Sequence, residues 1–406
     1  MHCDCIILGG GAAGLAACAA LASKNKRVTL IEKLDRVGKK IMAAGNGRCN
    51  LSNENMDAAL YGDAAPFVRA VYEKTPAQEV LHFFSDLGLM TSSEEGRIYP
   101  RTMMASSVLD VLRAGCEQEN VTILTGQEAV SITPSRRGGW SVQLDSGEGI
   151  FAPVVLCAMG GCASPHLGTD GAGVRLMETL GHGSTKQYPA LVQLKCDHGA
   201  LRSLKGIRVQ ARLTLEVDGK FAASETGELL FADYGVSGVC VFQLSGLAAQ
   251  SLDERKQVRL LVNLLPEINN VSEWLSARSN AHPQQNTLGL FTGVFPRLLT
   301  MAILKQAGIS AESTVSRLNG KQLAALAQAI AEFPLPVTGT QGFKNAQVTR
   351  GGIALAEVDP ATMASRLYDG LYILGETLDV DGPCGGYNLH FAFASALTAA
   401  KAIADR

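Results

Sequence analysis

Short apolar runs separated by small residues mark the beginning of the chain. Residues 5–8 are continuously apolar, which is typical of a strand buried on both faces of a parallel sheet. A glycine-rich stretch follows over 9–14, then an Ala- and Leu-rich segment to about residue 23 and a second apolar run over 27–31. This order predicts a strand, a tight turn, a helix and a second parallel strand.

The other end of the chain carries a similar pattern. Residues 370–374 predict a buried strand that ends in Gly375 and Glu376. A loop over 379–386 separates this strand from a predicted helix over 387–403, which is dense in Ala and Phe. Parallel strands are joined by long crossovers rather than by tight turns. We therefore expect the two ends of the chain to supply strands to one sheet.

Between the ends, the pattern first predicts more of the same domain. A helix is expected over 105–119, and short strands near 122–124, 129–133 and 140–144 are consistent with a meander. The apolar run at 154–157 predicts another buried strand, which turns sharply through small residues.

From about residue 188 the pattern changes. Apolar residues alternate with polar ones in four runs, which predicts a β-rich insert. These runs are 190–195, 209–217, 229–232 and 258–263. From residue 271 to about 333 apolar residues recur at helical spacing, as at Leu299, Ile303 and Leu326, and such a stripe is typical of helix packing in a core.

At 406 residues the chain is longer than a single hydrophobic core usually supports. The patterns together predict an α/β fold with a three-layer, Rossmann-type domain over 1–187 and 341–406. They also predict an inserted β-rich, barrel-like domain over 188–270 and a small helical domain over 271–340.

Composition narrows the class of protein. The formal net charge is −2, which argues against coating nucleic acid by bulk electrostatics. No apolar run reaches the roughly 20 residues of a membrane helix, and the first strand begins too early for a signal peptide. Ten cysteines occur without a C-x-x-C pair or any other metal-ligand spacing. We expect a cytoplasmic protein with no metal site and no membrane partner.

The glycine-rich turn has the spacing of a dinucleotide fingerprint. Gly9 permits the tight turn, Gly11 lets the backbone approach a pyrophosphate, and Gly14 lets the helix pack on the strand. Glu32 ends the second strand and can accept hydrogen bonds from a ribose diol. The helix N-terminus offers N–H groups to phosphates. Ala12, Ala13 and Lys33 adjoin these positions and are expected to line the same site.

The distant C-terminal block favours FAD over NAD. A strand that ends in a glycine and an acid, here Gly375 and Glu376, suits binding of the ribitol chain of FAD. The helix that begins at Tyr387 would point its N-terminus at the flavin pyrimidine, where charge accumulates on reduction. A domain that binds only NAD has no need of this element.

Several longer motifs resemble one family. Gly-Lys-Lys-Ile at 38–41, Gly-Asn-Gly-Arg-Cys-Asn at 45–50, Val-Thr-Arg-Gly-Gly at 348–352 and Gly-Gly-Tyr-Asn at 385–388 resemble the signature blocks of the BaiN/RdsA-like flavoproteins. These are also called aminoacetone-oxidase-like or NAD(P)/FAD-dependent oxidoreductases. The resemblance covers essentially the whole chain. It implies a bound FAD, a Rossmann domain and two inserted domains, and reduction of carbon–carbon double bonds in steroid-type molecules or in uridine of ribosomal RNA.

The remaining candidate FAD-binding residues come from these motifs and from two small-residue turns. Arg48 and Lys40 could neutralise the pyrophosphate or the substrate, although a solvated surface role stays open for Arg48. Asn46 and Asn50 could bind the cofactor or simply form turns. Ala129 lies in a segment that resembles the adenine contact. The other candidates are Gly47, Met159, Gly160, Gly161, Gly386, Tyr387 and Asn388.

Candidate catalytic residues lie at the start of the terminal helix. The phenol of Tyr387 or the thiol of Cys384 could protonate the α carbon of a substrate after hydride transfer to the β carbon. The helix N-terminus is expected to lower the pKa of the Cys384 thiol. Both residues could instead have only packing roles. His390 is expected to be a core histidine.

Three functions remain open. The first is an FAD-dependent oxidoreductase that reduces a carbon–carbon double bond of a small unsaturated substrate, and the second is a ribosomal RNA dihydrouridine synthase. The third is a flavin-based redox sensor without turnover. No second dinucleotide fingerprint is evident, so NAD(P)H is expected to dock only transiently as the reductant. The sequence contains one basic cluster, formed by Arg202, Lys205, Arg208 and Arg212. It would either contact RNA phosphates or form a solvated face of a strand.

Overall fold

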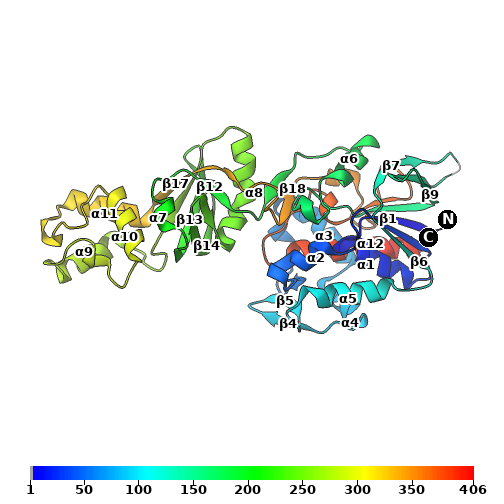
Figure 1. The fold of residues 1–406 in the computed structure, drawn as a ribbon, viewed down its shortest axis with the longest axis horizontal. Coiled ribbons are helices and arrows are strands. Elements are labelled where there is room, and N and C mark those ends of the chain that lie inside the picture. The colour runs from blue at the N-terminus through cyan, green and yellow to red at the C-terminus, as the bar shows by residue number, and fades with distance from the viewer. Residues whose placement is uncertain (1–2, 137) are drawn as a thin grey trace. The chain divides into compact units, whose positions relative to one another are not determined.

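The computed structural model describes residues 3–136 and 138–406 (Figure 1). It divides into two compact units, one formed by Met1–Tyr188 with Gln347–Arg406 and the other by Pro189–Ala346. The first unit is therefore built from both ends of the chain. The second unit holds both the β-rich and the helical segments, which the sequence analysis assigns to two separate domains.

A five-stranded parallel sheet forms the centre of the first unit, with the strand order β19-β10-β1-β2-β6. Cys5 pairs with Val28 on one side and Val154 on the other, so the N-terminal strand is central. The C-terminal strand β19 joins the sheet through β10. The strands are β1 (Cys5–Leu8), β2 (Val28–Glu32), β6 (Val121–Thr125), β10 (Val154–Cys157) and β19 (Leu371–Ile373).

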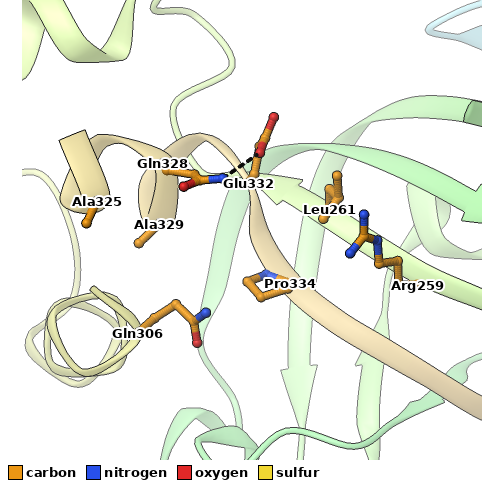
Figure 2. Close-up of a pocket in the computed structure, with 8 residues that line it drawn as sticks. All are labelled: Arg259, Leu261, Gln306, Ala325, Gln328, Ala329, Glu332 and Pro334. Carbon is orange, nitrogen blue, oxygen red and sulfur yellow. Dashed lines mark hydrogen bonds between the residues drawn. The ribbon is translucent and has the colours of Figure 1, made fainter. Parts of the chain in front are cut away.

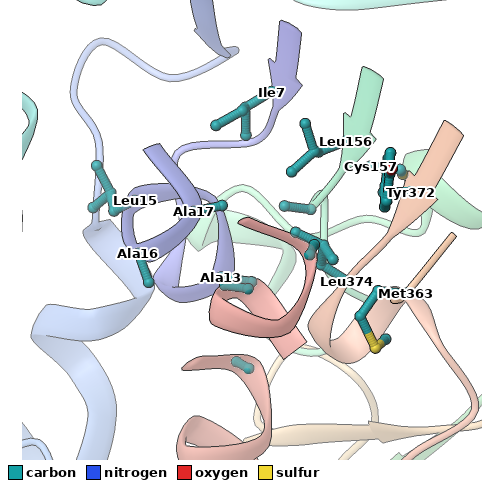
Figure 3. Packing of buried hydrophobic residues seen from close by; sticks show 14 of the residues in the cluster. Ile7, Ala13, Leu15, Ala16, Ala17, Leu156, Cys157, Met363, Tyr372 and Leu374 are labelled. Carbon is teal, nitrogen blue, oxygen red and sulfur yellow. The ribbon is translucent and has the colours of Figure 1, made fainter. Parts of the chain in front are cut away.

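Small residues let the first and last helices pack closely against each other. Helix α1 (Ala12–Ala22) contacts both α12 (Tyr387–Ala404) and α5 (Ala105–Cys116). Figure 3 shows Ala13, Ala16 and Ala17 of α1 in the same buried cluster as Ile7 and Leu156 of the sheet. The expected Rossmann-type α/β architecture is confirmed.

Two antiparallel sheets complete the first unit. One is a meander, β7-β8-β9, whose residues Trp140, Val142 and Leu144 are buried in the same core as the parallel sheet. Its first two strands were predicted, but the run near 122–124 that was expected beside them is β6 of the parallel sheet, and β9 was not predicted. The other, β3-β5-β4, was not predicted. The strands of these two sheets are β3 (Ser52–Asn53), β4 (Thr91–Glu94), β5 (Arg97–Pro100), β7 (Ala129–Pro134), β8 (Trp140–Leu144) and β9 (Gly149–Ala152). Strand β18 (Val348–Arg350) belongs to neither of them. The remaining helices are α2 (Lys39–Ala43), α3 (Ala65–Lys74), α4 (Ala77–Asp86) and α6 (Ala172–Thr179).

A closed barrel forms much of the second unit, with the strand order β12-β15-β14-β13-β16-β17. Its final strand, β17 (Phe333–Thr340), lies in the segment that the sequence analysis assigns to the helical domain. That assignment is wrong for these residues, because Phe333, Leu335 and Val337 alternate inward and close the barrel. The other strands are β12 (Leu194–Cys196), β13 (Arg208–Val217), β14 (Lys220–Ala232), β15 (Gly235–Ser237) and β16 (Val258–Asn263).

The helices of the second unit share one hydrophobic core with the barrel. They are α7 (Leu201–Leu204), α8 (Val239–Asp253), α9 (Val271–Ala281), α10 (Arg297–Gln306) and α11 (Gly320–Ala331). A pocket of about 300 Å³ lies between strands β16 and β17 and helices α10 and α11, with Arg259 and Glu332 on its lining (Figure 2). Within the described residues, no helix is long and apolar enough to span a membrane.

Candidate functional site

The glycine-rich turn packs closely against α1 at Gly14 and leaves open space at Gly11. A Cβ atom on Gly14 would lie 1.9 Å from the carbonyl oxygen of Gly9, so only glycine lets α1 approach the turn this closely. A Cβ atom on Gly11, by contrast, would meet no described atom within 4 Å. Gly11 caps α1 without a side-chain hydrogen bond, and Ala12 and Ala13 begin the helix. The open space therefore faces a helix N-terminus, which is where a phosphate binds.

Glu32 lies at the end of β2 and is fixed by two backbone donors. Its Oε2 accepts a hydrogen bond from the N–H of Gly10 at 2.8 Å, and its Oε1 accepts one from the N–H of Leu34 at 2.9 Å. Each carboxylate oxygen keeps a lone pair that can accept from a ribose hydroxyl. The neighbouring Lys33 forms an ion pair with Asp170 at 2.7 Å.

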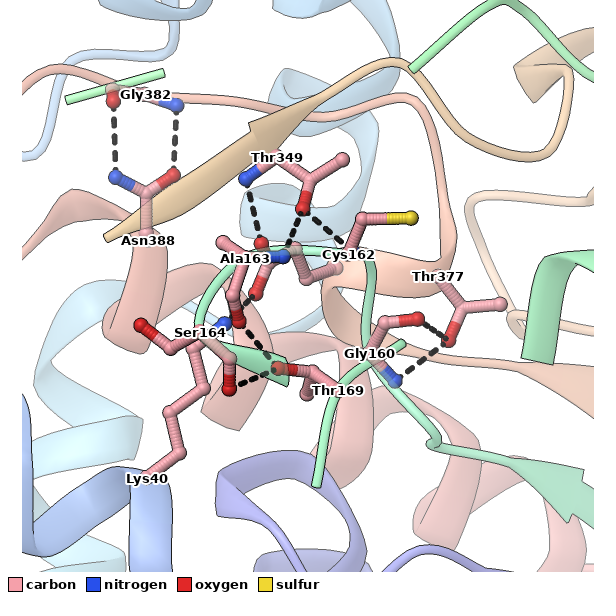
Figure 4. A network of polar contacts seen from close by, with 11 residues as sticks. Lys40, Gly160, Cys162, Ala163, Ser164, Thr169, Thr349, Thr377, Gly382 and Asn388 are labelled. Atoms are coloured by element: carbon pink, nitrogen blue, oxygen red, sulfur yellow. Dashed lines mark hydrogen bonds and ion pairs between the residues drawn. The ribbon is translucent and has the colours of Figure 1, made fainter. Parts of the chain in front are cut away.

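Two threonines hold the turn that follows β10. The hydroxyl of Thr349 accepts hydrogen bonds from the N–H groups of Cys162 at 2.7 Å and Ala163 at 2.9 Å (Figure 4). The hydroxyl of Thr377 accepts one from Gly160 at 3.1 Å. A Cβ atom on Gly161 would lie 2.4 Å from the Thr349 hydroxyl. Sequence reasoning predicted Met159, Gly160 and Gly161 here but missed both threonines, although each lies within or beside a recognised motif.

Lys40 and Glu376, both predicted, are brought together. The Nζ of Lys40 lies 2.7 Å from Oε2 of Glu376, while Oε1 accepts a hydrogen bond from the N–H of Thr349 at 2.6 Å. Gly375 directly precedes Glu376, and its N–H donates to Ser395 of α12. The carboxylate is therefore anchored to α2, β18 and, through the backbone, to the terminal helix.

The loop before α12 is held by Asn388. The Asn388 side chain accepts a hydrogen bond from the N–H of Gly382 and donates one to its carbonyl oxygen, both at 2.8 Å (Figure 4). Gly386 caps the helix at φ +99°, and a Cβ atom there would lie 2.3 Å from the carbonyl oxygen of Ser52. Beside it, Oδ1 of Asn50 is buried and has no hydrogen-bond partner among the described residues. This acceptor matches a ligand N–H such as that of the flavin pyrimidine.

The remaining predicted residues of the 45–50 motif lie elsewhere. The Arg48 guanidinium stacks over the ring of Tyr99, 4.6 Å from its centroid, and pairs with Glu94 at 2.9 Å. It is not brought to the Lys40–Glu376 pair. Asn46 and Gly47 are exposed, and Asn46 has φ +55°, which suits the turn-forming interpretation that the sequence left open. Ala129 is buried at the start of β7.

The two candidate proton donors occupy the same loop and helix start. Tyr387 is largely buried and packs edge-on against Tyr61 at 6.2 Å. Burial raises the pKa of Tyr387, and nearby Arg97 lowers it only in part, so the phenol stays protonated at neutral pH. Burial likewise raises the pKa of Cys384. The expectation of a lowered thiol pKa is therefore wrong, because desolvation disfavours the thiolate more strongly than the nearby positive charge favours it.

His390 is a core residue, as expected. It is completely buried, its Nδ1 lies 2.8 Å from the hydroxyl of Ser52, and burial lowers its pKa to about 3. The imidazole is therefore neutral at physiological pH. Its Nε2 has no hydrogen-bond partner among the described residues.

The loop before α12 also carries Asp381, which forms an ion pair with Arg350 that the sequence did not predict. The Nε of Arg350 lies 3.2 Å from each carboxylate oxygen of Asp381, and its Nη2 lies 3.1 Å from Oδ2. Burial raises the pKa of Asp381 despite the neighbouring guanidinium. Arg350 lies inside the block at 348–352 and Asp381 in the loop over 379–386, but nothing in the sequence pairs them. Within the described chain, no group of three or more His, Cys, Asp or Glu side chains is arranged to hold a metal.

Comparison with protein families decides the assignment. Residues 3–402 match the family described as HI0933-like protein Rossmann domain. The chain belongs to this family. The match spans both units, so the inserted barrel and helices are part of the HI0933-like chain.

Curated relatives of this HI0933-like protein are enzymes. It is 39% identical over 405 residues to the 3-dehydro-bile acid delta(4,6)-reductase of Clostridium scindens, covering 98% of each chain. It is 29% identical to the ribosomal RNA dihydrouridine synthase of Escherichia coli, covering 98% of this chain and 97% of that one.

Solved structures agree on the fold. The chain aligns over its full length with 99% of the 3-ketosteroid delta1-dehydrogenase from Sterolibacterium denitrificans, with a TM-score of 0.53 and 13% identity. It also aligns with 70% of the FrdA chain of Escherichia coli quinol fumarate reductase, with a TM-score of 0.52 and 15% identity. The family and these relatives establish this HI0933-like protein as an FAD-dependent oxidoreductase.

Proposed function

We propose that this protein reduces a carbon–carbon double bond conjugated to a carbonyl group in a small, steroid-like molecule, with NAD(P)H as a transient reductant. The observation that carries the proposal is the 39% identity along the full chain to a reductase named for a 3-dehydro-bile acid. A ketone next to a double bond makes the β carbon of that bond electrophilic. One hydride, which carries two electrons, and one proton then complete the reduction.

Bound FAD supplies the hydride in its reduced form. In the proposed arrangement, the open turn at Gly11 and the N-terminus of α1 hold the pyrophosphate, and Glu32 holds the adenosine ribose. The Lys40–Glu376 pair would hold the ribitol chain. The buried amide oxygen of Asn50 would accept a hydrogen bond from the flavin ring.

The protein must also deliver one proton to the α carbon of the substrate. Tyr387 is the proposed donor, because burial raises its pKa and keeps a proton on the phenol at neutral pH. Cys384 remains a second candidate on the adjoining loop. Its raised pKa also leaves it protonated, so it could act only as an acid and not as a thiolate nucleophile.

Reduction of uridine in ribosomal RNA is the alternative, and the relative at 29% identity supports it. The basic cluster offers little additional support. Lys205 is paired with Asp233 at 2.7 Å and Arg208 is paired with Glu228. These carboxylates reduce the positive charge that would attract phosphates. The small-molecule substrate is therefore preferred, and the enzyme names of the relatives favour turnover over a redox sensor.

The nicotinamide cofactor is expected to bind without a fingerprint of its own. The five-stranded sheet of the first unit is parallel, and the glycine-rich turn after its strand β1 is assigned to FAD. Glu32 then serves the FAD ribose and cannot discriminate a 2′-phosphate on the reductant. We expect NADH and NADPH to reduce the flavin at similar rates in anaerobic stopped-flow measurements.

The proposed function is tested by a competition between the two substrate classes. The FAD-loaded protein is reduced anaerobically and mixed in parallel with a 3-oxo-4-ene steroid and with an unmodified ribosomal RNA fragment. Reoxidation of the flavin by the steroid, with formation of the saturated ketone, supports the proposal. Reoxidation by the RNA alone, with formation of dihydrouridine, would replace it by the alternative.

A further inference from the structure

The Arg350–Asp381 ion pair is unused by the cofactor assignments above. Its geometry is specific: Nε of Arg350 is equidistant from both carboxylate oxygens at 3.2 Å, and Nη2 lies 3.1 Å from one of them. A guanidinium has five N–H donors in a rigid plane. Among the described residues, Nη1 has no hydrogen-bond partner. The side chain of Arg350 is 35% exposed and that of Asp381 19%, so part of the Arg350 side chain remains accessible.

Both partners are tied to the backbone that shapes the FAD site. Arg350 directly follows Thr349, whose hydroxyl fixes the turn at Cys162 and whose N–H binds Glu376 (Figure 4). Asp381 directly precedes Gly382, which Asn388 of α12 holds through two hydrogen bonds. The guanidinium is therefore presented from two anchored segments, at the loop that leads into Tyr387.

Reduction of a double bond conjugated to a carbonyl creates negative charge at a defined atom. When hydride adds to the β carbon, the π electrons move toward the carbonyl, and its oxygen becomes an enolate oxygen until the α carbon takes up a proton. A preorganised cation beside that oxygen stabilises the transition state. Arginine suits this role because it stays charged and has two donors on one edge.

Resting on the proposed function, we infer that Arg350 binds the carbonyl oxygen of the substrate and that Asp381 is a positioning residue that fixes the guanidinium. The substrate class is thereby narrowed to molecules with an oxygen acceptor conjugated to the double bond. Arg350 provides the charge and the N–H donors. Asp381 orients the guanidinium by binding its Nε edge. The Nη1 edge is then available to the substrate.

The test uses a ligand that binds without turnover. A phenolate that stacks on oxidised flavin produces a long-wavelength charge-transfer band, and its oxygen mimics the enolate. The FAD-loaded protein is titrated with p-chlorophenol at several pH values. We expect Arg350→Gln to weaken phenolate binding at least about tenfold, as for loss of a hydrogen bond to a charged group. Arg350→Lys and Asp381→Asn should lie between this variant and the parent.

Controls separate this inference from other roles of the guanidinium. Arg366→Gln removes another arginine of the same unit, which pairs with Asp359 at 3.8 Å, and should leave phenolate binding unchanged. The inference is overturned if Arg350→Gln binds phenolate like the parent. It is also overturned if both Arg350→Gln and Arg350→Lys lose FAD, because the guanidinium would then serve the cofactor. Phenolate binding needs no enone turnover, so it can succeed even where the proposed reductase activity fails.

Discussion

The side chain of Asn388 and the backbone of Gly382 form a reciprocal pair of hydrogen bonds, each 2.8 Å long. The pair joins the first turn of α12 to the loop that carries Asp381 and Cys384. Asn388 was expected to contact FAD, and the structure shows that its amide already has partners in this loop. Its effect on the cofactor is therefore expected to be indirect, through the shape of the loop.

Replacing Asn388 by Ala should loosen this loop and weaken FAD binding. Three hydrogen bonds are lost, two to Gly382 and a longer one to the carbonyl oxygen of Pro383 at 3.3 Å. At about 1 kcal/mol for each of the two shorter bonds, the dissociation constant of FAD should rise about tenfold or more. The change is measured by titrating apoprotein with FAD and following flavin fluorescence. Asn345→Ala serves as the control, because Asn345 bonds the backbone of Gln341 in the other unit. Equal FAD affinity in both variants would show that the loop is held in another way.

Gly11 and Gly14 should respond differently to substitution. Gly11→Val places its side chain in open space at the N-terminus of α1, so the protein should fold but lose most of its FAD. Gly14→Ala drives a Cβ into the carbonyl of Gly9 and should destabilise the fold by about 3 kcal/mol. Thermal unfolding and the flavin content after purification distinguish the two effects. Full flavin content in Gly11→Val would contradict the assignment of the pyrophosphate site.

Tyr387→Phe should separate proton transfer from cofactor binding. The substitution keeps the packing against Tyr61 and removes only the hydroxyl, so FAD content and reduction by NAD(P)H should be preserved. Reoxidation by the true substrate should slow by about 10²-fold if the phenol is the general acid. Cys384→Ala, assayed in the same way, tests the second candidate. If both variants reoxidise at the parent rate, the proton comes from another source.

Stability should depend on pH through His390. Its pKa in the folded protein is about 3, against an ordinary value of 6.5. The unfolded chain therefore binds a proton first as the pH falls, and stability is lost progressively from pH 6.5 downward. At pH 5 this residue lowers the free energy of unfolding by about 2 kcal/mol. Urea unfolding of the parent and of His390→Gln at pH 7 and pH 5 should reveal a smaller loss in the variant, whereas equal losses would contradict this assignment.

The sequence predicted those parts of the fold that repeat a local pattern. The runs at 5–8 and 154–157 are buried strands because both faces of a parallel sheet are covered. Phe333–Thr340 was assigned wrongly, because the helical domain was extended to residue 340, whereas the alternate residues of this strand close the barrel. The packing of this segment in the folded barrel decided its conformation, and its local sequence did not.

The site was predictable where one residue type has one geometric role. Gly14 and Gly386 allow close backbone contacts that no side chain would permit. Pairings across the fold were not predictable, as with Arg350 and Asp381, because each residue alone is compatible with a solvated surface. The pKa of Cys384 was mispredicted for a related reason. Its burial depends on packing that the local sequence does not encode.

The central claim is that reduced FAD in this protein passes two electrons to a conjugated carbon–carbon double bond, and a single-turnover experiment tests it most directly. The reduced protein is mixed anaerobically with one equivalent of a 3-oxo-4-ene steroid, while flavin absorbance and product mass are followed together. The account predicts that the oxidised flavin spectrum returns as a product two hydrogens heavier forms in equal amount. A flavin that stays reduced, or that reoxidises without that product, would contradict the account.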